Sequence, residues 1–158
     1  AEDYSVDLTA ATDRFPIEAI KEVLKGRFND DFVHSWARIM VGYPFWSNQL
    51  KRFVSYSVGN PMGAYSSWNS FTLAHHYVMF RCCKKTNIKF QTAPYVILGD
   101  DIVIADKSLY LEYMKEIDSL GVEVSISKTH KSKFAYEFAK RFLYNQKEIS
   151  PFPLSSLW

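Results

Sequence analysis

The sequence predicts an α+β fold in which an antiparallel sheet is backed by helices. The stretch YVILGDDIVI, residues 95–104, places apolar, β-branched runs on both sides of a Gly-Asp-Asp turn, which is typical of a β-hairpin. Around this hairpin, apolar residues recur at helical spacing in several longer stretches, whereas they alternate in shorter ones. Strands separated by helices in this way are typical of a sheet that is covered by a helical layer.

The composition predicts one folded domain over residues 1–158. A chain of 158 residues with 47% hydrophobic and 23% charged residues is long and apolar enough to bury a core, which excludes a disordered chain. The sequence contains no run of some 18 apolar residues that could span a bilayer. The cysteines, Cys82 and Cys83, are adjacent and lack zinc-site spacing, so buried, reduced thiols are expected. Because no initiator Met is present, the chain is expected to be part of a longer one.

The N-terminal part is predicted to hold two strands and two helices. A short strand over residues 4–8 ends near Asp7. Pro16 suits the first turn of a helix, where its missing N–H is not needed. The apolar stripe of this helix consists of Ile17, Ile20, Val23 and Leu24. A second helix is expected over residues 31–40, and a strand over residues 53–58 leads into the loop GNPMGAYSS.

The C-terminal part is predicted to hold a long buried helix, the hairpin, a second helix and two further strands. Apolar residues near helical spacing indicate the long helix over residues 68–83. After the hairpin, an amphipathic helix over residues 109–117 ends at Gly121. The two strands are expected over residues 122–126 and 134–138.

The charge is distributed unevenly along the chain. The formal net charge is only +2, yet residues 32–94 contain no Asp or Glu and carry a formal +7. The cations of this stretch are Arg38, Lys51, Arg52, Arg81, Lys84, Lys85 and Lys89. This segregation predicts a positive surface that faces an anionic partner, with nucleic acid as the first candidate. A solvated basic surface without a partner is the alternative.

Five motifs occur in an order that resembles a known family. They are DLTAATDRFP, GNPMGAYSSW, LGDDIVI, SKTHKS over residues 127–132, and YEFAKRF over residues 136–142. Together they resemble the palm domain of viral RNA-dependent RNA polymerases, most closely those of mitoviruses and their narnavirus relatives. The resemblance covers nearly the whole chain. It implies the palm of a larger fingers–palm–thumb enzyme that replicates viral RNA, and a palm fragment that is inactive alone.

The resemblance implies a two-metal nucleotidyl transfer centred on three aspartates. Asp7 and Asp100 match the principal metal ligands, and Asp101 matches the accessory acid beside them. The implied cofactor is Mg²⁺, with Mn²⁺ as the alternative, because two divalent ions activate the attacking 3′-hydroxyl and neutralise the departing pyrophosphate. Lys128 matches a catalytic general acid that protonates the pyrophosphate. Its alternative role is that of an ordinary lysine in a basic stretch.

The resemblance also implies residues that bind the incoming nucleotide. Asp13 matches an acid that accepts a hydrogen bond from the ribose 2′-hydroxyl, which distinguishes RNA from DNA precursors. The alternative for Asp13 is an acid at a helix N-terminus that is stabilised by the helix dipole. Arg14 is placed to contact the triphosphate or to form a surface ion pair. Asn69 is a candidate amide partner for Asp13, although it lies two residues after Ser67, whereas the family places the Asn one helical turn along.

The glycine-bearing loop GNPMGAYSSW is expected to contact RNA and nucleotide. Gly59 and Gly63 allow the backbone to approach the template closely, which makes them candidate RNA-binding positions. Ser66 and Ser67 are candidates for hydrogen bonds to a ribose or a phosphate. Their alternative role is to cap the helix that follows.

The implied partners are the RNA template, the product strand, ribonucleoside triphosphates and the remainder of the polymerase chain. The compartment is mitochondrial if the chain is mitovirus-like and cytoplasmic if it is narnavirus-like. A catalytically silent viral remnant captured in a genome, with at most weak RNA binding, is one alternative. A reverse transcriptase palm is another, which Gly99 and Asp13 disfavour. His75 and His76 are adjacent on a helix and are expected to pack or hydrogen-bond, since neighbouring helical positions cannot share a metal.

Overall fold

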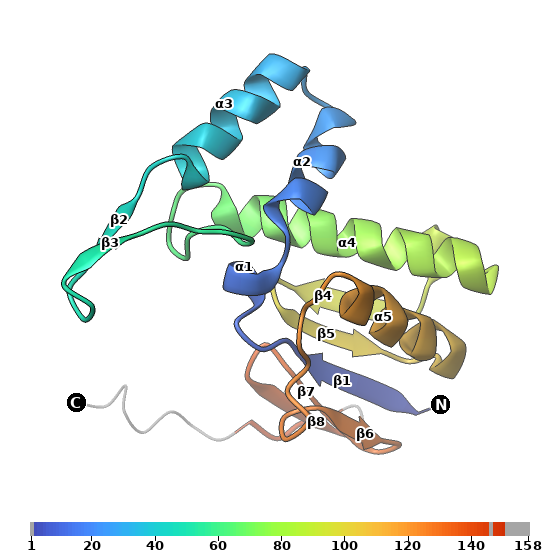
Figure 1. Ribbon diagram of the computed structural model, residues 1–158. Helices are drawn as coiled ribbons and strands as arrows, with labels where there is room; N and C mark the ends of the chain where they lie inside the picture. The colour runs from blue at the N-terminus through green and yellow to red at the C-terminus, as the bar shows by residue number, and fades with distance from the viewer. Residues whose placement is uncertain (1, 146, 151–158) are drawn as a thin grey trace.

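A four-stranded antiparallel sheet lies at the centre of the protein and confirms the predicted α+β architecture (Figure 1). The computed structural model describes residues 2–145 and 147–150. The strand order β4-β5-β1-β6 places the first strand of the chain between the hairpin and a later strand. The four strands are β1 (Asp3–Asp7), β4 (Tyr95–Leu98), β5 (Asp101–Ile104) and β6 (His130–Ser132).

The main helices agree with the apolar periodicity of the sequence. They are α2 (Ile17–Lys25), α3 (Asp30–Val41), α4 (Ser67–Thr86) and α5 (Lys107–Ser119), together with the short α1 (Ala11–Arg14) and η1 (Phe90–Thr92). The Asn29 side chain caps α3 by accepting the Phe32 N–H at 2.8 Å. Asp106 caps α5 in the same way through the Leu109 N–H at 2.8 Å. Figure 1 shows α4 and α5 together beside the hairpin β4–β5, with α2 and α3 beyond α4.

Two small sheets accompany the central one. The hairpin of β2 (Phe45–Ser47) and β3 (Arg52–Val54) projects away from the central sheet (Figure 1). The second small sheet contains β7 (Ala135–Phe138), β8 (Arg141–Tyr144) and β9 (Lys147–Glu148). Strand β7 contacts β1, β5 and β6, so this sheet lies across the central strands.

Two of the predicted strands differ from the structure, because one is shorter than expected and the other is not a strand. The strand expected over residues 53–58 is only Arg52–Val54, because the chain leaves β3 to reach the loop that docks near α1. The segment 122–126 forms no strand and makes only an isolated bridge between Val124 and Leu8. It is held to the end of β1 by two backbone hydrogen bonds of 2.8 Å, from the Thr9 N–H to the Glu123 carbonyl and from the Ser125 N–H to the Asp7 carbonyl. It then turns, because the Lys128 and Thr129 N–H groups bond back to the Ser125 carbonyl.

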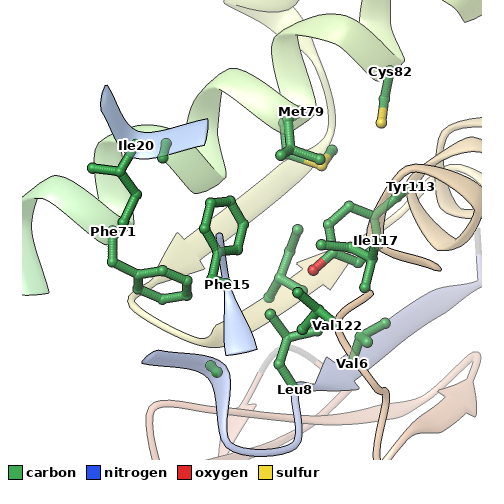
Figure 2. Packing of buried hydrophobic residues seen from close by; sticks show 14 of the residues in the cluster. Val6, Leu8, Phe15, Ile20, Phe71, Met79, Cys82, Tyr113, Ile117 and Val122 are labelled. Atoms are coloured by element: carbon green, nitrogen blue, oxygen red, sulfur yellow. The ribbon is translucent and has the colours of Figure 1, made fainter. Parts of the chain in front are cut away.

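The hydrophobic core fills the space between the central sheet and helices α2, α4 and α5 (Figure 2). Phe15 is fully buried and meets Phe71 of α4 edge to face, with ring centroids 5.2 Å apart. Tyr113 and Ile117 of α5 close the core from the other side. Cys82 lies in the same core as a free thiol, as expected, and burial raises its pKa to about 12. This thiol is therefore a packing group and stays protonated at neutral pH.

The predicted positive stretch does not form one continuous surface. Arg81 and Lys85 on α4 are paired with α5: the Arg81 Nε lies 3.1 Å from Glu116 Oε2, and the Lys85 Nζ lies 2.9 Å from Glu112 Oε1. Their charges are thus offset by acids from outside the stretch. Lys51 and Arg52 sit on the β2–β3 hairpin, which lies at the opposite side of Figure 1 from the C-terminal end of α4. Lys51 and Arg52 therefore lie apart from Arg81 and Lys85.

Within residues 2–145 and 147–150, none of the helices combines the length and the apolar composition needed to cross a bilayer.

We expect Phe15→Ala to lower the free energy of unfolding by about 3–5 kcal/mol, because it removes a fully buried ring and leaves a cavity beside Phe71. Chemical denaturation followed by circular dichroism measures the change. Phe134→Ala is the matched control, since the Phe134 side chain is 61% exposed and its loss should change stability by about 0.5 kcal/mol or less. Equal losses for the two variants would contradict the assignment of Phe15 to the core.

Candidate active site

Two of the predicted catalytic aspartates meet across adjacent strands. Asp7 is the last residue of β1 and Asp101 is the first residue of β5, and the antiparallel register pairs them directly. Directly opposed residues point to the same face of a sheet, with Cβ atoms about 4.5–5.5 Å apart. Asp100 precedes Asp101 in the turn between β4 and β5. The fold therefore brings Asp7 to the Asp100–Asp101 pair, which lies more than 90 positions further along the sequence.

The Gly99–Asp100 turn needs a glycine for two reasons. Gly99 has a φ of +62°, in the left-handed region that side chains disfavour. A Cβ at this position would also lie 1.9 Å from the Trp68 ring, so the indole packs directly on the turn. The glycine of the GDD motif thus serves the turn and its contact with α4.

The surroundings of Asp101 disfavour its charged form. Burial raises the pKa of Asp101, and the negative charges of Asp100 and Asp7 raise it further. A hydrogen bond from the Ala139 backbone at the tip of the β7–β8 hairpin acts in the opposite direction. Such a crowded set of oxygens fits a divalent cation, which would relieve the repulsion.

The carboxylates alone do not build a closed metal site. Across the part of the chain that the structure describes, no group of three or more His, Cys, Asp and Glu side chains lies close enough to hold a metal ion. Mg²⁺ does not require such a group, because it keeps several waters and binds through one or two carboxylates plus substrate phosphates. Asp7 and Asp101, with Asp100 beside them, fit an ion of that kind.

Lys128 lies at the same carboxylates. Its Nζ is 3.5 Å from Asp7 Oδ2, and the side chain is otherwise 70% exposed. The lysine reaches Asp7 because the segment after α5 is bonded to the end of β1 and then turns back at Ser125. An exposed ion pair of this length contributes little stability, so the contact matters mainly because it places an ammonium group beside the acids.

A pocket of about 340 Å³ opens beside the paired aspartates. It lies between the central sheet and the β7–β8 hairpin, and acidic and basic side chains face each other across it. Its lining includes Asp7, Asp101, Lys128, His130, Glu137 and Lys140. This mixture of charges suits a ligand that carries both anionic groups and cations.

The glycine-bearing loop docks against the turn that carries Asp13. The Asn60 N–H donates to the Thr12 carbonyl at 2.9 Å, and the Ile17 N–H donates to the Val58 carbonyl at 2.8 Å. A Cβ on Gly59 would lie 2.2 Å from the Thr12 carbonyl oxygen and 2.4 Å from the Asp13 carbonyl carbon. Gly59 is therefore required for the close approach of two backbones, and this contact positions Asp13.

Asp13 and Arg14 line a second, larger pocket of about 880 Å³. Both side chains are exposed, and Gly63, which has a φ of +81°, lines the same pocket. Tyr56 also lines this pocket, where burial and the neighbouring Asp13 carboxylate raise the pKa of its hydroxyl. The pocket offers an acid, a cation and open space next to the turn that follows β1.

The remaining predicted residues, Ser66, Ser67 and Asn69, lie in different surroundings. Ser67 is buried, and its hydroxyl accepts a hydrogen bond from Asn60 Nδ2 at 2.6 Å. Ser66 is exposed and its Oγ accepts the Trp36 indole N–H at 2.9 Å. Neither side chain makes a capping hydrogen bond to α4. Asn69 is exposed on α4 and does not line the pocket that contains Asp13.

Two residues near Asp13 were missed by the sequence analysis. Asn60 is fully buried and joins the loop both to the Thr12 carbonyl and to Ser67. The sequence offered a signal for Asn60, because this amide directly follows Gly59 in the motif GNPMG and a buried amide needs hydrogen-bond partners. Tyr56 had no comparable signal, because its proximity to Asp13 depends on how the chain returns from β3.

Comparisons with known proteins place the chain among RNA polymerases. The family model of the mitovirus RNA-dependent RNA polymerase matches residues 1–158. The RNA-directed RNA polymerase of Cryphonectria parasitica mitovirus 1 is 39% identical over 138 residues, which cover 87% of this chain and 17% of that protein. Two uncharacterized mitochondrial proteins of Arabidopsis thaliana are 34% and 37% identical over 80% and 93% of this chain. The matches cover 65% and 62% of those proteins, so the chain spans less than two thirds of each relative.

Solved structures with a similar fold include two kinds of polymerase. The RNA-dependent RNA polymerase of a human picorbirnavirus superposes with a TM-score of 0.70 at 16% identity, over 91% of this chain and 29% of that one. The telomerase of Candida albicans, in complex with a telomeric RNA fragment, superposes with a TM-score of 0.67 at 13% identity, over 95% and 30% of the two chains. At these identities the likeness shows the fold, a polymerase palm.

We expect Gly59→Ala to displace the loop from the Asp13 turn, because the added Cβ would overlap the Thr12 carbonyl oxygen at 2.2 Å. The loss of stability should be about 1–3 kcal/mol, as for other overpacked sites, measured by chemical denaturation. Gly63→Ala is the control for the loop, since no atom lies within 4 Å of a Cβ there, although its φ of +81° adds strain of its own. A Gly59→Ala protein that is no less stable than Gly63→Ala would contradict the docking contact.

Proposed function

Because the chain belongs to the mitovirus RNA-dependent RNA polymerase family, we propose that it is the catalytic palm of an RNA-directed RNA polymerase that replicates viral RNA. The observation that carries this proposal is the direct pairing of Asp7 with Asp101, beside Asp100 in the turn. Nucleotide addition is an in-line displacement at phosphorus, in which the protein contributes positioning and charge stabilisation. Paired carboxylates at the end of two central strands suit that task.

The residues that would hold the metal are Asp7, Asp100 and Asp101, and the proposed cofactor is Mg²⁺ or Mn²⁺. Bound divalent ions would supply Lewis-acid activation of the attacking 3′-hydroxyl and neutralisation of the leaving pyrophosphate. The carboxylates orient the reacting groups, and the paired strands hold Asp7 opposite Asp101. The Ala139 backbone steadies Asp101 by hydrogen bonding to its carboxylate.

Lys128 is the proposed general acid. Its ion pair with Asp7, at 3.5 Å, keeps the ammonium group beside the carboxylates while most of the side chain stays in solvent. A lysine in this position can hold a proton close to the departing pyrophosphate and release it as the bond to the leaving oxygen breaks. The exposure of the side chain leaves it free to turn toward the substrate.

The incoming ribonucleoside triphosphate is proposed to occupy the pocket of about 880 Å³. Asp13 would accept a hydrogen bond from the ribose 2′-hydroxyl, and Arg14 would contact the triphosphate. The docking of Gly59 and Asn60 on the Thr12–Asp13 backbone supports this assignment, since it holds the acid in place. Ser66 is proposed to contact the nucleotide and Gly63 to contact RNA, whereas Ser67 and Gly59 serve the site through the shape of the loop.

The proposed partners are the RNA template, the product strand and the rest of the polymerase. The chain spans 17% of the mitovirus polymerase that it resembles, so fingers and thumb elements come from elsewhere in the full protein. A mitochondrial location is supported by the two Arabidopsis relatives, which are described as mitochondrial proteins. RNA binding outside the active site would use the basic hairpin β2–β3, which carries Lys51 and Arg52.

A catalytically silent remnant is the second candidate. The relatives in a plant mitochondrion favour it, because a captured viral sequence would be found there. Retention of the paired Asp7 and Asp101 is the observation against it. A reverse transcriptase palm shares the fold. Asp13 supports the RNA polymerase over it, because a reverse transcriptase needs a bulky ribose-excluding side chain at this position.

In the full-length polymerase, Asp7→Asn and Asp100→Asn should each reduce the rate of nucleotide addition more than about 100-fold, because each removes charge that holds the metal. Asp101→Asn should reduce the rate less. Templated primer extension with Mg²⁺ measures the rates, and circular dichroism checks that each variant is folded.

Asp118→Asn is the matched control, since Asp118 is an exposed residue on α5 away from the site. It should leave the rate unchanged. A folded Asp100→Asn enzyme with near-normal activity would refute the metal assignment, and a wild-type enzyme without activity would favour the silent remnant.

Asp13→Ala should reduce the preference for ribonucleotides over deoxyribonucleotides by about 1–3 kcal/mol, the cost of an unmade buried hydrogen bond. The measurement is the ratio of kcat/KM for each nucleotide and its 2′-deoxy analogue. Asp30→Ala, in the exposed first turn of α3, is the control for removing an acid at a helix start. An unchanged ratio, together with a loss of stability, would support the helix-dipole role of Asp13 instead.

A further inference from the structure

We propose that His75 is a positioning residue that fixes the Gly99–Asp100 turn through a hydrogen bond to the Gly99 carbonyl oxygen. The inference rests on the proposed function, because the turn matters for activity only if Asp100 is catalytic. His75 lies on α4, behind the turn and inside the core, so it does not contact substrate. It would act through the backbone that carries Asp100.

The hydrogen bonds of His75 define its orientation and its tautomer. Nδ1 lies 2.8 Å from the Gly99 carbonyl oxygen, and Nε2 lies 2.7 Å from the Tyr113 hydroxyl. A carbonyl oxygen only accepts, so Nδ1 must carry the proton. Nε2 of the neutral ring then accepts a hydrogen bond from the Tyr113 hydroxyl. A chain of hydrogen bonds therefore runs from Tyr113 on α5 through His75 on α4 to the Gly99 carbonyl in the turn.

Burial favours the neutral form of this histidine. His75 is fully buried, and burial lowers its pKa to about 4, although the Gly99 carbonyl opposes the shift and His76 adds to it. A neutral imidazole has one donor and one acceptor, and here both are used. Rotating the ring would leave two buried polar groups unpaired, which makes the observed orientation strongly preferred.

Planarity of the peptide bond carries this constraint to Asp100. The Gly99 carbonyl and the Asp100 N–H belong to one rigid peptide unit, so fixing the oxygen fixes the start of Asp100 as well. Gly99 adopts a φ of +62°, and without a side chain its backbone has more conformations open to it than any other residue of the turn. The Trp68 ring packs on Gly99, and His75 holds the carbonyl. Together these two α4 residues restrict the turn.

The neighbouring His76 provides a natural comparison. It lies on the same helix and also meets a tyrosine, with Nδ1 3.0 Å from the Tyr95 hydroxyl. It is only partly buried, and its partner lies at the start of β4 rather than in the turn. The two histidines therefore share residue type, helix and kind of partner, and differ in burial and in contact with Gly99.

Two substitutions separate the two hydrogen bonds of His75. An Asn amide nitrogen occupies the place of Nδ1, so His75→Asn retains the donor to Gly99 and loses the contact with Tyr113. A Gln amide reaches the place of Nε2, so His75→Gln retains the Tyr113 contact and loses the donor to Gly99. Both variants lose one buried hydrogen bond, which makes their thermal stabilities comparable.

In the full-length polymerase, His75→Gln should lower kcat about 10- to 100-fold with less than about a threefold change in the nucleotide KM, because a catalytic group displaced by about 1 Å can cost that much. His75→Asn should recover most of this loss. His76→Gln is the control and should leave kcat unchanged. Equal kcat values for His75→Gln and His75→Asn, or losses that follow the melting temperature, would overturn the proposal.

Hydrogen exchange followed by mass spectrometry tests the same contact without activity. The peptide covering residues 96–101 should exchange faster in His75→Gln than in His75→Asn or wild type. If the wild-type enzyme made no RNA, the proposed function would fail while this measurement still judged the contact. Unchanged exchange in His75→Gln would overturn the positioning role whatever the activity of the enzyme.

Discussion

The antiparallel register of β1 on β5 is the constraint on which both the core and the site depend. It pairs Asp7 with Asp101 and, one step along, Val6 with Ile102. Side chains alternate across a strand, so the aspartates face one side of the sheet while the apolar pair is buried against the helices. A slip of one residue would turn a carboxylate into the core and expose an apolar side chain. The burial that stabilises the fold therefore also places the acids.

The same pairing concentrates negative charge that the protein must tolerate. The pKa of Asp101 is raised by burial and by its two acidic neighbours, which means that the ionised form of this carboxyl is disfavoured. Lys128 and the Ala139 backbone offset part of this repulsion. A structural role would not require three acids at one point. Local instability of this kind is what a site that binds divalent ions and triphosphates is expected to show.

The elements that depend on local pattern could be predicted from the sequence, whereas those that depend on distant contacts could not. The hairpin at Gly99 and the helices carry their own periodicity, caps or turn residues. The segment 122–126 has strand-like composition, yet its one bridge joins Val124 to Leu8, just beyond β1, because α5 and the turn at Ser125 set its path. Within the site, the aspartates were found from motifs. Tyr56 and Asn60 were missed because their roles arise from how the loop folds back onto Asp13.

Helix α4 links the two halves of the site. At its start, Ser67 holds Asn60 and hence the loop that supports Asp13. Trp68, the next residue, packs on Gly99, and His75, about two turns further along, bonds to the Gly99 carbonyl. An α-helix is stiff over this distance, so the turn that carries Asp13 and the Gly99–Asp100 turn are both held by one rigid element. Their relative position is then set by the packing of α4 in the core, which explains why a buried histidine far from solvent belongs to the organisation of the site.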